Sequence, residues 1–394
     1  MNTTNNESPV VLPPVIPTGG TIDELLAYMI RLDGDDLIVA PDVVPVIKAH
    51  NKIIPAANRA LDEHEVAECA NYLAGADIRG LIAQGKPFDG AHALPLDDNG
   101  FPLDERARAE LPDPEQTARF RVNIVGSEGL YQPVMTITCR KISARPPTVA
   151  QIGLEPAFVD KIFERKIGIT IIAGATGQGK STTLAAMLAY ILARSDANEN
   201  LVTLEHPVEY VYHLIDKPSS FVTQLQVGRD ISSFASGIRN ALRMGPTTIL
   251  VGEMRDMVTI DAAVQAALTG HRVLSTIHAN DAAAIIPRAL RAYPEGEREQ
   301  AKADLLVAIE TLISQRLVPA IHAPRIALRE YLQLDRNIRR ILQQTKLSEL
   351  DIVIRELIET HGQSFAQAAR EAAAKGLIAD DVCEQFIRAQ GGES

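Results

Sequence analysis

The residues from Gly174 to Ser181 have the types and the order of a phosphate-binding loop. The segment Gly174-Ala175-Thr176-Gly177-Gln178-Gly179-Lys180-Ser181 places glycine, four variable residues, glycine, lysine and serine in the pattern of that motif. Glycines let backbone N–H groups surround a phosphate at the positive end of a helix. Lys180 can reach the β- and γ-phosphates, and Ser181 can bind Mg²⁺. We therefore predict that the chain binds a nucleotide.

Carboxylates follow two apolar segments further along the chain, and nucleotide hydrolysis needs a carboxylate near the attacking water. The run Thr248–Glu253 is apolar and ends in glutamate, so we predict that Glu253 orients or deprotonates water. The segment Leu204–Tyr210 carries a second acid, Glu205, and another glutamate four residues later. Both can lie at the carboxyl edge of a sheet, where ligands bind in open α/β folds. Taken alone, this pair is more simply a solvated surface feature.

Histidines form a third feature, within Thr269–Asn280. His278 ends another strand-like run, from which it could contact a γ-phosphate. A lone histidine at such a place is more often structural, so the sequence leaves both roles open.

The elements that must position these residues are indicated by alternating strands and helices. Before the loop, Ile169–Ala173 is a short β-branched run typical of a buried strand, and residues 184–192 carry apolar side chains at helical spacing. Further strands are predicted at Leu201–Glu205, Thr248–Glu253 and Val273–His278. This alternation predicts an α/β fold with a parallel sheet covered by helices on both faces.

The sequence before the loop predicts a smaller α+β domain. Helices are expected from Thr21 and around His64–Ala74, and strands at Asp36–Ala40, Val44–Ala49, Arg119–Asn123 and Val134–Arg140. Paired prolines within Ser143–Thr148 indicate a linker. The predicted limits are a flexible segment at 1–20, the smaller domain at 21–142, the linker at 143–156, the phosphate-loop domain at 157–324 and an Ala-, Glu- and Gln-rich helical region at 325–394.

Composition limits the classes of function. Hydrophobic residues make up 46% of the 394 residues, which indicates folded domains. The net charge of −11, 4% aromatic residues and the lack of Trp leave little surface for nucleic acid, so no direct nucleic-acid binding is expected. The three cysteines have no metal-ligand spacing and suit a reducing compartment. Because we find neither a signal pattern nor an apolar run of about 20 residues, we expect a cytoplasmic protein that meets membranes only through partners.

The loop and the segments after it, in this order, resemble the PilT and type II–IV secretion ATPase superfamily. There the loop is followed by an Asp box, a Walker B segment and a His box, which correspond here to Leu204–Tyr210, Ile249–Asp256 and Thr269–Asn280. The resemblance covers roughly residues 21–344. It implies a hexameric ATPase with a PAS-like amino-terminal domain and a RecA-like domain, with ATP and Mg²⁺ as cofactors.

The resemblance also implies roles for individual residues. Glu205 and Glu253 become the catalytic carboxylates, and His278 becomes the phosphate sensor. The superfamily neutralises the γ-phosphate with arginines of the amino-terminal domain, and the matching residues are Arg119, Arg121 and Arg140. Solvated edge-strand arginines are the alternative. The residues expected to bind the nucleotide are Gly174, Ala175, Thr176, Gly177, Gln178, Gly179, Lys180, Ser181 and Thr182.

Two departures from the superfamily pattern concern the metal. His206 stands where related chains carry aspartate, and Gly245-Pro246-Thr247 stands where they carry Asp-Pro-Asp. With Thr247 in place of an acid, Mg²⁺ is expected to depend more on Ser181, the phosphates and water held by the glutamates. The run Arg243–Pro246 is similar to the DotB branch, which serves type IVB secretion and conjugation.

The first hypothesis is therefore a ring-forming ATPase that powers a type IVB (Dot/Icm-type) secretion or conjugative transfer system. Protein partners would recruit it peripherally to a membrane-associated complex at the inner membrane. The alternatives are a type IV pilus retraction motor and, in another class, a nucleic-acid translocase or helicase. The region from about Leu347 has no recognisable motif, and packing on the core, partner binding and ring regulation all stay open.

Overall fold

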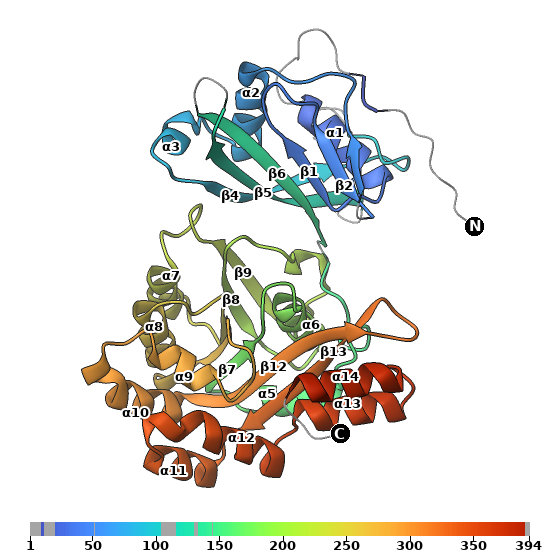
Figure 1. The fold of residues 1–394 in the computed structure, drawn as a ribbon. Helices are drawn as coiled ribbons and strands as arrows, with labels where there is room; N and C mark the ends of the chain where they lie inside the picture. Colours follow the sequence, from blue (N-terminus) through green and yellow to red (C-terminus); the bar gives the residue numbers. More distant parts are fainter. Residues whose placement is uncertain are drawn as a thin grey trace. The chain divides into compact units, whose positions relative to one another are not determined.

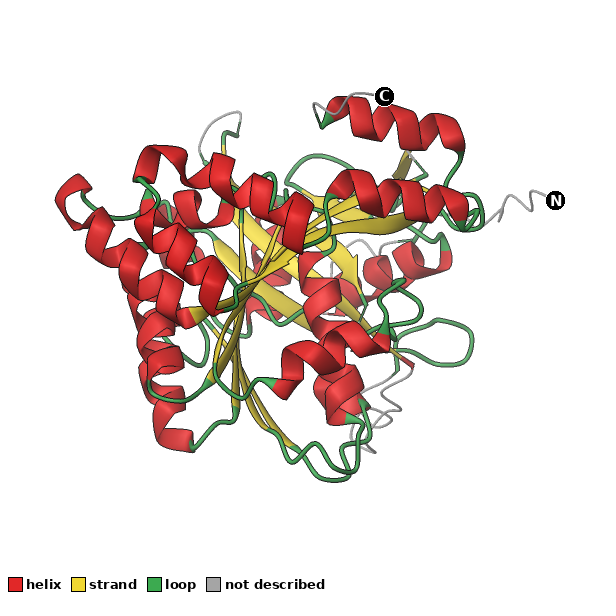
Figure 2. Ribbon diagram, turned by 90° about the horizontal axis from the view of Figure 1, so that it is seen from below, coloured by secondary structure: helices red, strands yellow, loops and turns green. Residues whose placement is uncertain are grey.

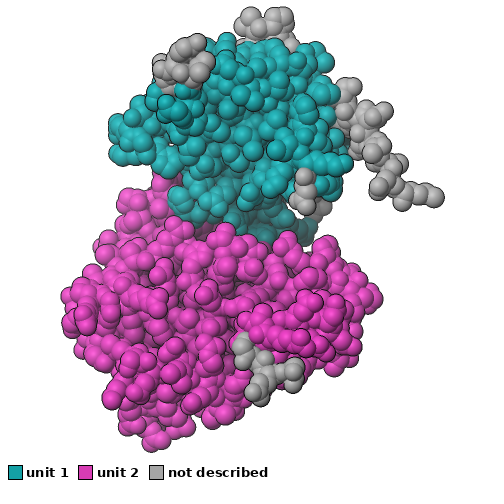
Figure 3. Space-filling view, viewed as in Figure 1, with its two compact units in different colours: residues 1–145, 206–214 teal, residues 146–205, 215–394 magenta. Residues whose placement is uncertain are grey.

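The chain folds into two compact units in a computed structural model, which describes residues 9–11, 20–50, 52–103, 116–129, 133–143 and 145–390. The first unit comprises residues 1–145 and 206–214, and the second comprises residues 146–205 and 215–394 (Figure 3). Most of the predicted flexible segment 1–20 lies outside the described residues. No helix among those described combines the length and apolar character needed to cross a membrane.

The first unit is built on a six-stranded sheet with the order β3-β2-β1-β6-β5-β4, in which every neighbouring pair is antiparallel. Side chains alternate along β5, so that Phe120, Val122 and Ile124 are fully buried, while Arg119 and Arg121 face the other side. Residue ranges in this unit are α1 Gly20–Arg31, β1 Asp36–Val39, β2 Val46–Ala49, β3 Lys52–Pro55, α2 Glu63–Ala74, α3 Arg79–Ala83, β4 Phe88–Pro95, β5 Thr117–Ser127 and β6 Val134–Ile142.

Helix α2 shows how local sequence sets an element's limits in this unit. Asp62 accepts a hydrogen bond from the Glu65 backbone, and the Glu65 side chain accepts one from the Asp62 backbone at 2.9 Å. This capping box satisfies two N–H groups that the first turn leaves unpaired. At the other end Gly75 has φ of 69°, the left-handed conformation that ends helices. The apolar face of α2, including Val66 and Ala70, joins the core of the unit.

The second unit contains a seven-stranded sheet with the order β13-β12-β7-β11-β10-β8-β9 (Figure 1). Neighbouring strands from β12 to β9 are parallel, and only β13 pairs antiparallel, at one edge. Its strands are β7 Gly168–Ala173, β8 Asn200–Glu205, β9 Phe221–Gln226, β10 Thr248–Val251, β11 Arg272–Ile277, β12 Ile309–Pro319 and β13 Arg325–Gln333.

Helices lie on both sides of this sheet (Figure 2). The main core combines alternate strand residues such as Ile169 and Ile171 with α8, α9 and α10, whereas α6 contacts β7 and β11 from outside that cluster. The predicted α/β class is therefore confirmed; the PAS-like assignment of the first unit stays a prediction. The helices are α5 Pro156–Glu164, α6 Lys180–Leu192, α7 Phe234–Ala241, α8 Met257–Leu268, α9 Ile285–Leu290, α10 Arg298–Ala308, α11 Arg336–Gln344, α12 Leu350–His361, α13 Phe365–Ala374 and α14 Asp380–Ala389.

The prediction of an entirely helical region over 325–394 is wrong at its start. Residues Arg325–Gln333 form β13, which pairs with β12 along its full length. Leu328 and Leu332 are buried and separated by Glu330, which is also buried, so the strand lacks the polar alternation that marks a half-exposed strand. Strand β13 was missed because the Ala-, Glu- and Gln-rich helices that follow it dominate the composition of this region.

Candidate nucleotide site

Four adjacent parallel strands bring the predicted site residues to one edge of the sheet. Strands β7, β11, β10 and β8 lie side by side in this order and run in the same direction. The loop follows β7, His278 follows β11, Glu253 follows β10, and Glu205 is the last residue of β8. The carboxyl edge of an open parallel sheet is where ligands bind in α/β proteins.

The loop has the backbone conformation that its glycines permit. Gly177 and Gly179 have φ of 79° and 75°, which residues with a Cβ rarely adopt. Helix α6 begins directly afterwards at Lys180, so Ser181 and Thr182 lie in its first turn. The Lys180 ammonium donates hydrogen bonds to the carbonyl oxygens of Gly174 at 2.8 Å and Ala175 at 3.0 Å. The loop thus presents a cation and a helix amino terminus together.

Glu253, just after the end of β10, lies between two basic side chains. One carboxylate oxygen is 3.2 Å from Nε2 of His278, and the other is 2.6 Å from an Arg255 nitrogen. The Glu253 side chain is 14% exposed, against 38% for His278 and 72% for Arg255. The Glu253 hydrogen bond raises the pKa of Arg255 above its ordinary value, because it stabilises the charged guanidinium. The Glu253 carboxylate is therefore largely buried, whereas the two side chains that pair with it are more exposed.

A pocket of about 550 Å³ joins this carboxylate to the phosphate loop. Its polar lining comes from Thr176 of the loop, Glu253, Arg255, His278 and two arginines of the α9 region, Arg288 and Arg291. Neither of these arginines was predicted from the sequence. They lie three residues apart, on and directly after the helix that follows the His box, and this spacing was the signal that could have found them.

Glu205 makes a different set of contacts from Glu253. Its Oε1 atom accepts a hydrogen bond from the Thr203 hydroxyl at 2.6 Å and from the Gln224 amide at 3.2 Å. Thr203 precedes it on β8, and Gln224 lies on the neighbouring strand β9. Among the described residues, the lining of the 550 Å³ pocket includes Glu253 but not Glu205. The structure therefore places both acids at one edge but not in one pocket.

The three predicted arginines belong to the first unit. Arg121 forms two hydrogen bonds with Asp89, at 3.1 and 2.5 Å, and Arg140 forms two with Asp36, at 2.6 and 3.1 Å. In each case the hydrogen bond to the carboxylate raises the arginine's pKa. Arg119 donates to the carbonyl oxygens of Val208 and Glu209, both at 3.1 Å, and these belong to the 206–214 segment of the same unit.

The structure places Thr247 away from the phosphate loop, although the family pattern suggested that an acid at this position would share in binding the metal. Thr247 immediately precedes β10, whose first residue is in register with Arg272, and Arg272 is in register with Gly168, the first residue of β7. Thr247 therefore lies at the edge opposite to the loop, which follows the last residue of β7. A strand of six residues separates the two edges by roughly 17–20 Å. The residue that replaces the superfamily's aspartate is too far away to bind the same metal ion.

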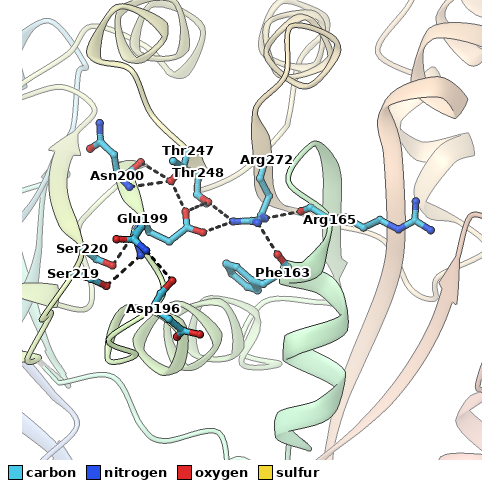
Figure 4. A network of polar contacts seen from close by, with 11 residues as sticks. Phe163, Arg165, Asp196, Glu199, Asn200, Ser219, Ser220, Thr247, Thr248 and Arg272 are labelled. Atoms are coloured by element: carbon cyan, nitrogen blue, oxygen red, sulfur yellow. Dashed lines mark hydrogen bonds and ion pairs between the residues drawn. The ribbon is translucent and has the colours of Figure 1, made fainter.

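Figure 4 shows what Thr247 contacts instead. Its hydroxyl donates to Glu199, which also accepts from the Thr248 hydroxyl at 2.7 Å and from Arg272 at 2.7 Å. Arg272 donates further to the carbonyl oxygens of Phe163 and Arg165, at 2.8 and 3.0 Å. These residues form a closed polar cluster at the amino edge of the sheet, away from the loop.

The strand order and the glycine-rich turn between β7 and α6 define the P-loop class of α/β proteins. A protein-family model described as type II/IV secretion system protein matches residues 89–345, and the chain belongs to this family. The type IV pilus retractation ATPase PilT of Pseudomonas aeruginosa is 33% identical over 357 residues, which cover 91% of this chain and 95% of that protein. Membership of the superfamily predicted from the motifs is thereby confirmed.

Solved structures show the same relationship over nearly the whole chain. The X-ray structure of the Legionella pneumophila ATPase DotB matches with a TM-score of 0.84 at 30% identity, covering 97% of this chain and 100% of that one. The pilus retraction motor PilT with bound ADP matches with a TM-score of 0.73 at 28% identity, covering 93% and 96%. The chain is therefore similar both to the ATPase DotB and to the pilus retraction motor PilT.

Proposed function

We propose that this protein hydrolyses ATP to energise a type IVB secretion or conjugative transfer system. The observation that carries the proposal is the pocket that joins Thr176 of the phosphate loop to Glu253 and His278. The similarity to DotB along 97% of the chain supports the choice of system.

The side chains of the pocket fit distinct roles in phosphoryl transfer to water. The loop and the amino terminus of α6 hold the phosphates, and Lys180 exchanges its carbonyl acceptors for phosphate oxygens. Glu253 accepts a hydrogen bond from the attacking water and orients it. His278, 3.2 Å from Glu253, holds that carboxylate and contacts the γ-phosphate. We also propose Glu205 as a second carboxylate for the water; it lies at the neighbouring strand end, bonded to Thr203 and Gln224, and does not line this pocket.

Oxygen donors beside the loop fit Mg²⁺, which is held by one or two protein ligands together with phosphates and water. The hydroxyl of Ser181 and the carboxylate of Glu253 are donors of this kind. No group of three or more His, Cys, Asp and Glu side chains within the described part of the chain could hold a metal ion. Bound with the nucleotide, Mg²⁺ would neutralise phosphate charge.

The arginines of the first unit complete the proposed machinery. Arg119, Arg121 and Arg140 lie on β5 and β6, and each already holds a well-defined acceptor. In the assembled protein one or more of them would neutralise the γ-phosphate, a contribution worth about 10³–10⁵ in rate in other phosphoryl-transfer enzymes. We propose a homohexamer in the cytoplasm that protein partners recruit to a membrane-bound complex. Particle images with a nonhydrolysable ATP analogue test the assembly directly.

Replacement of Lys180 by alanine tests the proposed activity. The variant should lose ATP turnover entirely, because the neutral side chain can no longer stabilise charge on the β- and γ-phosphates. Turnover is measured as phosphate release with Mg²⁺ present. Full activity in the variant contradicts the mechanism. Comparing ATP with GTP in the same assay defines the nucleotide.

A pilus retraction motor is the second candidate, because PilT is 33% identical over 91% of this chain. The chemistry would be the same and the partners different. Neighbouring genes for pilins or for a secretion channel separate these two roles. Strong, salt-sensitive stimulation of turnover by DNA would instead favour a nucleic-acid translocase.

A further inference from the structure

A series of buried hydrogen bonds connects the phosphate loop to β12 and β13, two strands that carry none of the site motifs. Gln315 on β12 is 1% exposed and Arg329 on β13 is 7% exposed. Arg329 Nε donates to Oε1 of Gln315 at 2.8 Å, and the same oxygen accepts from the Thr183 hydroxyl of α6 at 2.7 Å. The Gln315 amide nitrogen then donates to the carbonyl oxygen of Gln178 in the loop at 2.7 Å.

The phosphate loop packs closely on β12, so the hydrogen bonds of Gln315 help to set the position of the loop. A Cβ atom on Gly174 would lie 2.8 Å from the Gln315 carbonyl oxygen, and one on Gly179 would lie 3.0 Å from the Gln315 amide nitrogen. The Gln178 side chain in turn accepts a hydrogen bond from the Leu317 backbone at 2.6 Å. Several bonds from one strand therefore hold the peptide units whose N–H groups would surround a phosphate.

The other end of the chain of bonds reaches the segment by which the polypeptide enters the second unit. Arg329 donates to the carbonyl oxygens of Gly153 at 3.2 Å and Ile152 at 3.0 Å. Both belong to the turn at 148–154, which is closed by a hydrogen bond from Leu154 N to Val149 O at 2.9 Å. The second unit begins at Pro146, immediately before this turn.

Arg329 is a cation whose described partners are all neutral. Its hydrogen bonds go to three carbonyl-type oxygens and, at 3.5 Å, to the Thr183 hydroxyl, and no carboxylate among the described residues pairs with it. Burial lowers its pKa to about 10, so the guanidinium still carries its charge at neutral pH. A buried cation without a counter-ion is costly and gains from negative charge nearby. A nucleotide polyphosphate on the loop would supply that charge.

We propose that Gln315 and Arg329 are positioning residues that connect the phosphate loop to the turn at 148–154. Through Gln178, Gln315, Arg329 and the carbonyl groups of Ile152 and Gly153, nucleotide binding orders the turn through which the chain passes between the units. Because binding couplings are reciprocal, anything that displaces the turn weakens nucleotide binding by the same factor. This inference rests on the proposed nucleotide site and adds the route by which that site communicates with the rest of the chain.

Hydrogen exchange on the full-length protein tests the coupling, with and without a nonhydrolysable ATP analogue and Mg²⁺. In the unmodified chain the analogue should slow exchange of the 148–154 amides by about 5-fold or more. Arg329→Met should lose that slowing and bind the analogue about 10-fold more weakly, with partial recovery in Arg329→Lys. Arg339→Met is the control, because Arg339 donates to the backbone carbonyls of Leu306 and Ile309 and to the Glu310 carboxylate but to no residue of the loop or the turn.

A second pair of variants tests the same coupling by changing the turn itself, without altering the buried side chains of Gln315 and Arg329. Gly153 and Gly376 both have left-handed φ, 59° and 66°, and open space where a Cβ would lie. Gly153→Ala should strain the turn and weaken analogue binding by about 3- to 10-fold, whereas Gly376→Ala should leave it unchanged. If Arg329→Met does not fold, this pair decides the question.

The outcomes separate this proposal from the proposed function. An unmodified chain that does not bind the analogue overturns the nucleotide site itself. Normal binding with unchanged exchange at 148–154, or equal effects of Gly153→Ala and Gly376→Ala, overturns the coupling alone.

Discussion

The two edges of the seven-stranded sheet each bring an acid and a base together, yet they do so differently. At the carboxyl edge Glu253 meets His278, whose side chain is 38% exposed, beside a pocket. At the amino edge Glu199 meets Arg272, with side chains 10% and 6% exposed. The first pair is open to a ligand, whereas protein groups occupy the donors and acceptors of the second (Figure 4). Exposure, rather than charge, separates the two pairs, and it is the reason that we propose catalysis at the first edge and a structural role at the second.

The largest expected effect comes from Glu253→Gln at the carboxyl edge. The amide cannot accept a proton from water, so turnover should fall by about 10²–10⁴ while the affinity for a nonhydrolysable ATP analogue is retained. The measurement combines steady-state phosphate release with analogue binding.

Glu199→Gln is the matched control for this comparison, because it makes the same change at the amino edge. It should lower the melting temperature and keep turnover per folded molecule. If the two variants lose activity equally, the assignment of one edge to catalysis and the other to structure is wrong.

The next effect is on stability and comes from Arg272→Met. Removing the guanidinium leaves Glu199 buried without its cation, which should cost about 3–5 kcal/mol in the free energy of unfolding. Arg255→Met at the carboxyl edge is the control: Arg255 is 72% exposed, and loss of its ion pair should cost less than about 1 kcal/mol. Urea unfolding at pH 7 measures both, and equal losses would contradict the distinction between the edges.

The pH dependence of the same experiment gives a second check. Burial opposes the charge on Glu199, but the hydrogen bond from Thr247 and the charge of Arg272 outweigh it and lower the pKa. A carboxyl whose folded pKa is depressed adds stability above its unfolded pKa of about 4.3, and this is lost as pH falls through the folded value. The difference between the unmodified chain and Arg272→Met should therefore shrink below about pH 4.

Motifs and strand patterns predicted the carboxyl edge well. The strand before the loop, the strands that end at Glu205, Glu253 and His278, and these three residues themselves were expected, because each strand is an apolar β-branched run that leads to a polar residue. The structure places these residues at one edge, since parallel strands in this order bring their ends together. Spacing along the chain could not show that Glu205 contacts Thr203 and Gln224 rather than the Glu253 pocket.

Long-range polar contacts could not be predicted, because they depend on partners far apart in sequence. Gln315 contacts the loop across 137 positions, and Arg329 reaches Ile152 across 177. Neither residue belongs to a motif, and β13 was mistaken for part of a helical region. Thr247 was misread for the opposite reason: a family motif suggested a metal ligand, although the residue precedes the start of β10 and the proposed metal site follows strand ends.

The smallest effect tests that last point through Thr247→Asp, which introduces the acid found in the superfamily pattern. If position 247 bound the metal, the variant should need less Mg²⁺ for half-maximal turnover. The geometry predicts an unchanged Mg²⁺ requirement, because the length of a strand separates this position from the loop. The new carboxylate would instead face Glu199 in place of a hydroxyl donor, and like charges in a buried cluster repel. We expect a loss of about 1–3 kcal/mol in stability, measured by urea unfolding, and Thr247→Asn should lose less because it adds no charge.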